Sequence, residues 1–242
     1  MSSQQTSPYI RSSLARALYF KYLEMESNKN SSHEEWYSIK NDLLPVELTK
    51  SFIPSRQDDE TEQFLKNCYE KSDSLFIQLY HSIAKSLLSF FVTSTTANGI
   101  LNRGSMFVMS REQFKELLGI PSDYRTHTLI DLGAGDGMVT EKMAPFFNRV
   151  YATEASSGMR YRLKQKNFTV LDTEKWDDLQ MIPKDDIESV NGIPQFDVIA
   201  CLNLLDRCDR PISLLNKIKM ALKPNSGRLL IALVLPLSQY VE

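Results

Sequence analysis

The chain has 242 residues, of which 42% are hydrophobic and 24% charged, a composition typical of a folded soluble protein. Its 28 Lys and Arg nearly balance its 30 Asp and Glu, so the net charge of −2 excludes a strong whole-chain attraction to nucleic acid or to anionic membranes. Three scattered cysteines exclude a disulfide scaffold and a four-thiolate zinc site. The length allows one α/β domain with an appendage, or two small domains.

The first 125 residues are expected to be mostly helical and carry no obvious chemistry. The candidate helices are Ser12–Glu26, His33–Leu44, Thr61–Glu70, Ser74–Val92 and Ser110–Leu118. The last of these begins with Ser110 followed three residues later by Gln113, which is a capping-box pattern. Gly119 and Pro121 then predict the end of that helix.

No run of 18 apolar residues is present, so we expect no transmembrane segment. The most apolar helix, Leu75–Val92, has apolar residues at helical spacing, which predicts packing within the protein; a membrane-surface helix is the alternative. The first acidic residue is Glu24, and an acid-poor start with arginines and serines is also a mitochondrial transit pattern. We favour a docked or disordered arm and expect an intracellular, cytoplasmic monomer, with mitochondrial or endomembrane association as the alternatives.

From Thr126 onward the pattern changes to short apolar strands that alternate with helices. The expected strands are Thr128–Leu132, Arg149–Thr153, Phe168–Leu171, Phe196–Leu202 and Gly227–Leu235. The expected helices between them are Val139–Phe147, Ser157–Lys166 and Pro211–Leu222. The last strand is apolar almost throughout, as a strand buried on both faces should be. This alternation predicts an α/β fold with a doubly wound parallel sheet.

A glycine turn follows the first of these strands. Residues 131–137 read Asp-Leu-Gly-Ala-Gly-Asp-Gly, with a glycine at every second position from Gly133. Glycines let the backbone turn tightly and approach a ligand closely. An acid, Glu154, ends the next strand 23 residues after Asp131, which is the context of a nucleotide-type cofactor site.

Two classes of ligand fit such a turn, and a purely structural turn is the third interpretation. A dinucleotide prefers a third glycine where Met138 stands, and Asp136 within the loop would repel a pyrophosphate. S-adenosylmethionine has no phosphate, and its ammonium and sulfonium charges favour nearby acids. Glu154 can accept hydrogen bonds from both ribose hydroxyls. We therefore predict S-adenosylmethionine as the cofactor.

The turn after the fourth strand, Cys201–Asp209, is expected to face the same crevice, because ligands of open α/β sheets bind at the carboxyl ends of the strands. Asn203 and Asp206 are thus candidates for cofactor and substrate contacts. The alternative is that Asp209 caps the next helix and that Asp206 forms an exposed ion pair with Arg207. Together with the glycine turn, the predicted cofactor-binding residues are Asp131, Gly133, Gly135, Asp136, Gly137, Glu154 and Asn203.

The acidic segment 172–188 and the cysteines are two further features that bear on the chemistry. Residues 172–188 hold seven acids against two lysines, which usually indicates a solvated loop but is also a negative rim able to attract a cationic or His-rich peptide. Trp176 in this segment is a candidate for stacking near an adenine. Cys201 and Cys208 have no partner histidines, so we predict no metal site, and Cys201 is expected to be a buried strand thiol.

Several segments resemble one known family. They are Phe76–Ser82, Arg103–Val108, Leu132–Gly137, Tyr151–Glu154, Cys201–Asp209 and Leu230–Pro236. The sequence resembles the DREV family of methyltransferase-like proteins, the protein-histidine N-pros methyltransferases that modify His-x-His motifs. The likeness runs from about residue 60 to the last residue, and the Cys201–Asp209 segment is its most specific part.

The resemblance implies a Rossmann-like class I S-adenosylmethionine-dependent methyltransferase sheet with an N-terminal helical extension. It implies that the glycine loop and Glu154 hold the cofactor, that Asn203 serves the cofactor or the reacting region, and that Asp206 is a substrate-side carboxylate. We accordingly expect Asp206 and Asn203 to be the catalytic residues. Such enzymes continue through two further strands that help form the substrate pocket, so the chain is expected to be C-terminally truncated.

The chain is expected to consist of three segments and to have one activity. Residues 1–59 are expected to form an arm, 60–125 a helical extension that packs on the core, and 126–242 the methyltransferase domain. The expected activity is methylation of the pros nitrogen of histidine in His-x-His motifs of protein substrates, with no nucleic-acid partner. The alternatives are a methyltransferase for another substrate and a non-catalytic S-adenosylmethionine-binding or interaction protein.

Overall fold

The computed structural model describes residues 37–40, 44–73, 106–183 and 187–239, together with a few single residues before 102. The chain forms two compact units, residues 1–78 and 79–242. The expected helices Ser12–Glu26, His33–Leu44 and Ser74–Val92 lie largely outside the described residues. In the described part of the chain, no helix is long and apolar enough to span a bilayer.

In the first unit, the expected helix Thr61–Glu70 is confirmed as part of the longer α3, Asp59–Asp73, which follows the short α2, Val46–Thr49. The earlier start of α3 has a clear local cause. The carboxylate of Asp58 accepts hydrogen bonds from the backbone N–H of Thr61 at 2.9 Å and from its hydroxyl at 2.7 Å. Acidic side chains in the first turn of α3 stabilise the helix further, because they interact favourably with the positive end of its dipole.

In the second unit, α6 spans Arg111–Leu118, and its predicted capping box is present. The Ser110 hydroxyl accepts from the Gln113 N–H at 3.0 Å, and the Gln113 side chain accepts from the Ser110 N–H at 2.9 Å. Gly119 ends the helix with φ 56°, a left-handed conformation that favours glycine.

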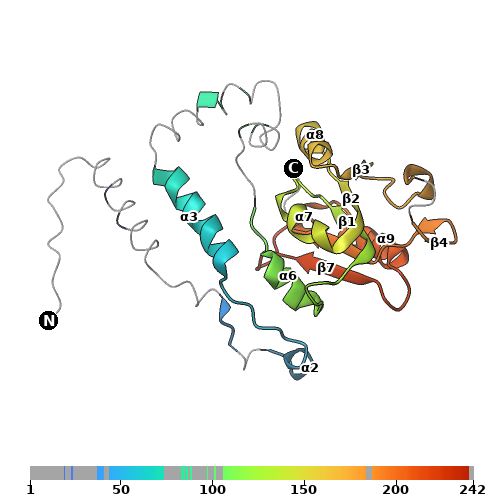
Figure 1. The fold of residues 1–242 in the computed structure, drawn as a ribbon, viewed down its shortest axis with the longest axis horizontal. Coiled ribbons are helices and arrows are strands. Elements are labelled where there is room, and N and C mark those ends of the chain that lie inside the picture. Colours follow the sequence, from blue (N-terminus) through green and yellow to red (C-terminus); the bar gives the residue numbers. More distant parts are fainter. Residues whose placement is uncertain are drawn as a thin grey trace. The chain divides into compact units, whose positions relative to one another are not determined.

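The second unit contains the predicted parallel sheet (Figure 1). Its five strands are β1 (Thr126–Leu132), β2 (Phe147–Thr153), β3 (Thr169–Leu171), β6 (Val198–Leu202) and β7 (Arg228–Ala232). The strands lie in the order β3-β2-β1-β6-β7, and every neighbouring pair is parallel. The connecting helices are α7 (Met138–Met143), α8 (Ser157–Gln165) and α9 (Pro211–Ala221). The α/β fold class is confirmed.

Short elements complete this unit. They are the 3-10 turns η3 (Ala144–Phe146), η4 (Leu179–Met181) and η5 (Leu205–Arg207) and the two-stranded hairpin β4 (Ser189–Val190) and β5 (Ile193–Pro194). The expected helix Val139–Phe147 is wrong at its end, because α7 stops at Met143 and Phe147 already belongs to β2. Pro145 lacks the N–H that a continuing helix needs.

The strand order places a topological switch point between β1 and β6. From β1 the chain builds outward through β2 and β3 on one side, and β6 and β7 lie on the other side. In open sheets of this kind, ligands bind in the crevice beyond the carboxyl ends of the two strands at the switch. Leu132 ends β1 opposite Cys201, so the glycine turn and the turn after β6 leave the sheet side by side.

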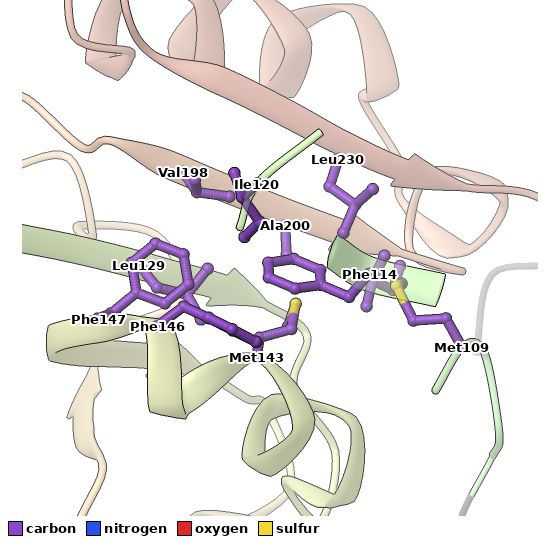
Figure 2. Close-up of a cluster of buried hydrophobic side chains, with 11 residues drawn as sticks. Met109, Phe114, Ile120, Leu129, Met143, Phe146, Phe147, Val198, Ala200 and Leu230 are labelled. Carbon is purple, nitrogen blue, oxygen red and sulfur yellow. The ribbon is translucent and has the colours of Figure 1, made fainter. Parts of the chain in front are cut away.

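Two hydrophobic layers hold the sheet between them. On one face Phe114 of α6 and Met143 of α7 pack against Leu129, Val198 and Ala200 (Figure 2). The residues of β6 that alternate with Val198 and Ala200 point to the opposite face of the sheet, where they pack with α9. This second cluster includes Ile130, Leu132, Tyr151, Phe196, Ile199, Cys201, Ile218 and Ala221. The alternation is the two-residue period of a strand buried on both sides.

The acidic segment does not behave as a freely solvated loop. Trp176 is 2% exposed, and its ring lies 6.3 Å from that of Phe196 in the second cluster, so the expected stacking on an adenine is wrong. Lys217 of α9 holds the segment by an ion pair to Asp177 at 3.0 Å and a hydrogen bond to the carbonyl of Glu174 at 3.1 Å.

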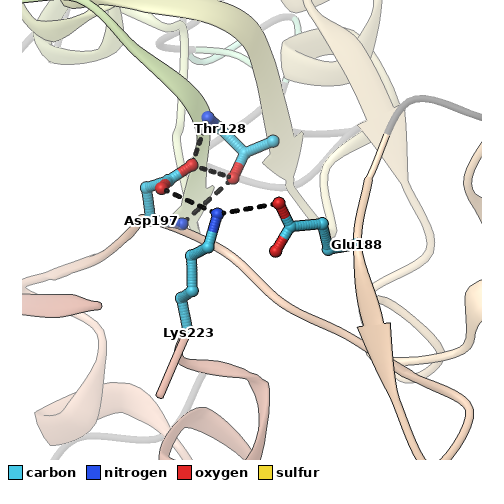
Figure 3. Close-up of polar contacts among 4 residues, drawn as sticks. All are labelled: Thr128, Glu188, Asp197 and Lys223. Carbon is cyan, nitrogen blue, oxygen red and sulfur yellow. Dashed lines mark hydrogen bonds and ion pairs between the residues drawn. The ribbon is translucent and has the colours of Figure 1, made fainter. Parts of the chain in front are cut away.

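A polar network lies at the amino ends of β1 and β6, the end of the sheet opposite to the crevice (Figure 3). The Asp197 carboxylate accepts from the Thr128 N–H and hydroxyl, both at 2.9 Å. Lys223 lies 3.7 Å from Asp197 and 3.1 Å from Glu188. The hydrogen bond to Glu188 raises the pKa of Lys223, and the charge of Asp197 adds to the effect.

Candidate active site

Three segments meet at the carboxyl ends of the central strands: the glycine loop after β1, Glu154 after β2, and the turn after β6. The parallel pairing of β2, β1 and β6 puts their ends on one edge of the sheet, as sequence reasoning predicted. A ligand in this crevice contacts backbone from the first segment and side chains from the other two.

The glycine loop has left-handed backbone at Gly133, Gly135 and Gly137, with φ of 73°, 57° and 77°. A β-carbon on Gly137 would lie 2.7 Å from a methyl group of Leu163, so this glycine lets α8 pack against the start of α7. A β-carbon on Gly135 would have no atom within 4 Å. The backbone of Gly135 is therefore the part of the loop left open to a ligand.

Glu154 is bonded directly to the glycine loop. One carboxylate oxygen accepts from the Gly135 N–H at 2.9 Å, and the other accepts from the Ser156 N–H at 2.8 Å. Thr153 also holds the glycine loop. Its hydroxyl accepts a hydrogen bond from the Gly133 N–H at 3.2 Å, and its carbonyl accepts one from the Ala134 N–H at 2.9 Å. Each oxygen of Glu154 keeps a lone pair for a further donor, such as a hydroxyl.

Asp131 lies in β1 and is only 2% exposed. One of its carboxylate oxygens accepts a hydrogen bond from the Thr140 hydroxyl at 2.6 Å. Burial raises the pKa of Asp131 to about 7, the Thr140 hydrogen bond opposes the rise, and the charge of Glu154 adds to it. The residue thus supports the loop from within, and a direct cofactor contact from it stays a prediction.

Asp136 stays within the loop. Its carboxylate accepts from the N–H of Met138 at 3.1 Å, at the start of α7. The Met138 side chain is 42% exposed beside the loop, where Lys166 lies 3.6 Å from its sulfur. Asp136 thus occupies the first N–H of α7 and places a carboxylate at the helix start, where it would repel a phosphate.

The turn after β6 carries the other two predicted residues. Asn203 has a left-handed φ of 51°, and its N–H donates to the Ala232 carbonyl at 2.9 Å, which fixes the turn to β7. Asp206 lies in η5, and its Oδ1 atom is buried without a hydrogen-bond partner among the described residues. Such an atom is expected to meet a donor that enters from outside the chain.

The alternative interpretation of this turn is wrong. Asp209 does not cap α9, since the N-cap residue is Arg210 and no side chain bonds the helix start. The salt bridges of the described residues include no pair between Asp206 and Arg207. Gln239 instead fixes the far end of the turn, since its side-chain amide donates to the Cys208 carbonyl at 3.0 Å.

Cys201 is buried in β6, as expected. Burial raises the pKa of its thiol to about 12, and the charges of Asp131, Cys208 and Asp206 act in the same direction. The thiol is therefore protonated and unreactive at neutral pH. Residues 106–183 and 187–239, like the other described positions, hold no cluster of His, Cys, Asp and Glu suited to a metal ion.

Sequence reasoning missed the residues that hold the site in shape. Thr140, Thr153 and Ser156 each bond a predicted site residue or its loop, at the distances given above. Ser156 also accepts from the N–H of Met159 as the N-cap of α8, at 3.5 Å. A Ser two residues after an acidic strand end is a capping signal that could have indicated it.

A parallel sheet with a glycine loop, an acid after the second strand and, at the switch point, a carboxylate oxygen without a partner among the described residues has the features of a nucleoside-binding domain. The family model described as DREV methyltransferase matches residues 36–242. The chain belongs to the DREV methyltransferase family.

Solved structures give more distant likenesses. The YcgJ protein from Bacillus subtilis is 19% identical over 46% of this chain and 45% of its own, with a TM-score of 0.33. Precorrin 8w decarboxylase from Methanobacterium thermoautotrophicum is 22% identical over 54% of this chain and 67% of its own, with a TM-score of 0.37. N-methyltransferase NodS from Bradyrhizobium japonicum, in complex with S-adenosyl-L-homocysteine, is 18% identical over 44% of this chain and 52% of its own, with a TM-score of 0.31. The chain thus spans between 45% and 67% of the length of these structures, and the family assignment rests on the family model.

Proposed function

We propose that this chain binds S-adenosylmethionine in the switch-point crevice and methylates the pros nitrogen of histidine in His-x-His motifs of protein substrates. The observation that carries the proposal is the buried Oδ1 atom of Asp206, which has no hydrogen-bond partner among the described residues and lies in a turn beside the glycine loop of a DREV-family chain.

The residues present fit the cofactor. Glu154 is fixed by two backbone N–H groups and keeps lone pairs for two ribose hydroxyls. The open side of Gly135 leaves room for close approach of a nucleoside. The cluster of carboxylates around the loop suits a cofactor with two positive charges and no phosphate.

S-adenosylmethionine supplies a methyl group on a positively charged sulfur, ready for in-line displacement. Most of the catalysis then comes from positioning, since a neutral imidazole is already a competent nucleophile at neutral pH. Asp206 would accept the N–H of the tele nitrogen, which leaves the lone pair on the pros nitrogen. Asn203, held in its unusual conformation by the bond to Ala232, would position the reacting groups.

The test is transfer of a tritiated methyl group from S-adenosylmethionine to a His-x-His peptide, with the modified atom assigned by fragmentation mass spectrometry and comparison with both methylhistidine isomers. We expect Asp206→Asn to lower turnover by about 100-fold or more while cofactor affinity changes little. Asp209→Asn is the matched control, since Asp209 is an exposed acid of the same turn.

Three results would contradict parts of the proposal in a distinguishable way. Absence of cofactor binding by calorimetry would leave an inert interaction module. Binding with methylation of other residues would leave a methyltransferase for another substrate. Equal turnover of Asp206→Asn and Asp209→Asn on the histidine peptide would remove Asp206 from the reaction.

A further inference from the structure

A groove of about 400 Å³ lies between α8 and β3 in the second unit. One wall is a single face of α8 and consists of Ser157, Arg160, Tyr161 and Lys164. Residues three, four and seven positions apart lie on the same side of a helix. The other wall is formed by Val170 and Leu171 of β3.

The groove follows the outer edge of the sheet. Strand β3 is the last strand in the sheet order and pairs with β2 alone. Val170 and Leu171, which line the groove, are consecutive residues of this last strand. In residues 106–183 and 187–239 no other strand pairs with that edge, so its backbone N–H and C=O groups can accept an added strand.

The helix wall of the groove is cationic. Helix α8 contains no Asp or Glu, and Arg160 and Lys164 lie one turn apart on it. Within the described part of the chain neither side chain has an ion pair or a hydrogen bond. Tyr161 between them is 64% exposed and offers an aromatic surface.

The one acid of the groove is already engaged. The Asp172 carboxylate accepts from the N–H groups of Glu174 and Lys175 at 2.9 and 3.1 Å, and these bonds hold its pKa below the usual range. Arg160 and Lys175 contribute less to this lowering. The two cations of α8 therefore remain available for carboxylates from outside.

We propose that this groove binds an extended acidic segment of a partner protein, which adds as a strand to β3 and places two carboxylates against Arg160 and Lys164. The spacing fits. Four helical residues rise about 6 Å, and two same-face residues of a strand are about 6.6 Å apart, so acids at alternate positions match the two cations. The partner motif is thus Glu-x-Glu or Asp-x-Asp within a segment able to form a strand.

This docking site goes beyond the proposed methyl transfer and stands independently of it. Arg160, Lys164 and Tyr161 belong to none of the three segments that meet at the switch-point crevice, which are the glycine loop, Glu154 and the turn after β6. The groove would add affinity for a partner that carries such a segment, whether or not that partner is methylated.

The test is fluorescence anisotropy with the full chain and a labelled nine-residue peptide that alternates Glu with Val and Thr. Arg160→Glu/Lys164→Glu should weaken binding by about tenfold or more, because two attractive pairs become repulsive. Arg125→Glu/Lys219→Glu is the matched control, with the same charge change at two exposed sites outside the groove, and should stay within about twofold. Urea unfolding checks that each variant folds; if the Glu pair does not, Arg160→Gln/Lys164→Gln replaces it.

A second peptide tests the strand pairing directly. N-methylation of alternate backbone amides removes the donors along one edge without changing charge, and should abolish binding when these amides face β3. Equal binding of that peptide in both methylation registers would overturn the proposal, as would an equal loss in the control double variant. Displacement by an oligonucleotide of the same charge would assign the cations to nucleic acid, and stoichiometric displacement by S-adenosylmethionine would assign the groove to the cofactor site; either overturns it.

Discussion

Asp131 shows how one buried residue couples the site to pH. Its pKa of about 7 in the folded chain exceeds the ordinary value of 3.8, and the cause is burial. Between these values the folded chain holds a proton that the unfolded chain releases. The contribution of this residue to stability is therefore fully present below pH 4 and is lost as pH rises toward 7.

We predict that Asp131→Asn removes this loss. Asn retains an oxygen that can accept from Thr140, so the stability of the variant relative to the wild type should rise between pH 4.5 and pH 8 by on the order of 3 kcal/mol. Urea unfolding at several pH values measures the difference, and Asp123→Asn, an exposed aspartate, is the control. Parallel pH curves for wild type and Asp131→Asn would contradict the prediction.

Two glycines of one loop should respond differently to alanine. Gly137→Ala places a methyl 2.7 Å from Leu163 at φ 77°, so it should destabilise folding by about 2 kcal/mol or more. Gly135→Ala meets open space at φ 57°, so its cost to folding is the left-handed strain alone, about 1 kcal/mol.

The same pair separates folding from binding. Gly135→Ala should weaken S-adenosylmethionine binding by calorimetry at a temperature where it is fully folded, because the methyl occupies the side left open to the ligand. Under conditions where the Gly137→Ala variant is folded, its affinity for S-adenosylmethionine should be closer to that of the wild type. The reverse order of affinities would show that the ligand approaches another part of the loop.

At the scale of elements, the acidic segment is held by packing as much as by charge. Trp176 is enclosed by the cluster around Phe196 and α9, and Trp→Ala changes in cores cost about 3–5 kcal/mol. We predict that Trp176→Ala unfolds at a lower urea concentration, followed by circular dichroism, whereas Met181→Ala, exposed in the same segment, shifts the midpoint little. Trp176→Phe is the milder variant if the alanine variant does not fold, and midpoints equal to that of the wild type would contradict the packing.

The elements differed in how far sequence could predict them. Strands β1 and β6 and the capping box of α6 follow from local patterns, because burial on two faces and a Ser with a Gln three residues later leave short-range signals. The burial of Trp176 had no such signal, since charged residues, Lys175 and Asp177, flank it. Its buried neighbours, such as Phe196 and Ile218, lie far along the chain.

Within the site, the same distinction holds. The glycine loop and Glu154 were predictable from spacing, because a strand, a turn and a second strand end fix their relation. The Thr140–Asp131 bond depends on how α7 folds back on the sheet, and spacing alone does not determine it. The same holds for η5 and for the Oδ1 atom of Asp206, which has no partner among the described residues.

At the scale of the whole second unit, the two ends of the sheet divide stability from chemistry. The network of Thr128, Asp197, Lys223 and Glu188 lies at the amino ends of β1 and β6, and the crevice lies at their carboxyl ends. Thr128 and Leu132 are four residues apart on β1, about 13 Å at the rise of a strand. A change in the network therefore has no direct path to a ligand in the crevice.

We predict that Asp197→Ala destabilises the chain by about 2–3 kcal/mol and leaves cofactor affinity unchanged. The loss arises because the Thr128 N–H and the Lys223 ammonium lose their shared acceptor in a part-buried place. Urea unfolding measures the first effect, and calorimetry with S-adenosylmethionine at a temperature where both proteins are folded measures the second. Asp206→Asn should instead lower turnover and leave the free energy of unfolding nearly unchanged. The buried Oδ1 of Asp206 has no hydrogen-bond partner to lose among the described residues. A fall in cofactor affinity that scales with the destabilisation of Asp197→Ala would show instead that the crevice depends on the tightness of the whole sheet, and the separation of the two ends would then be wrong.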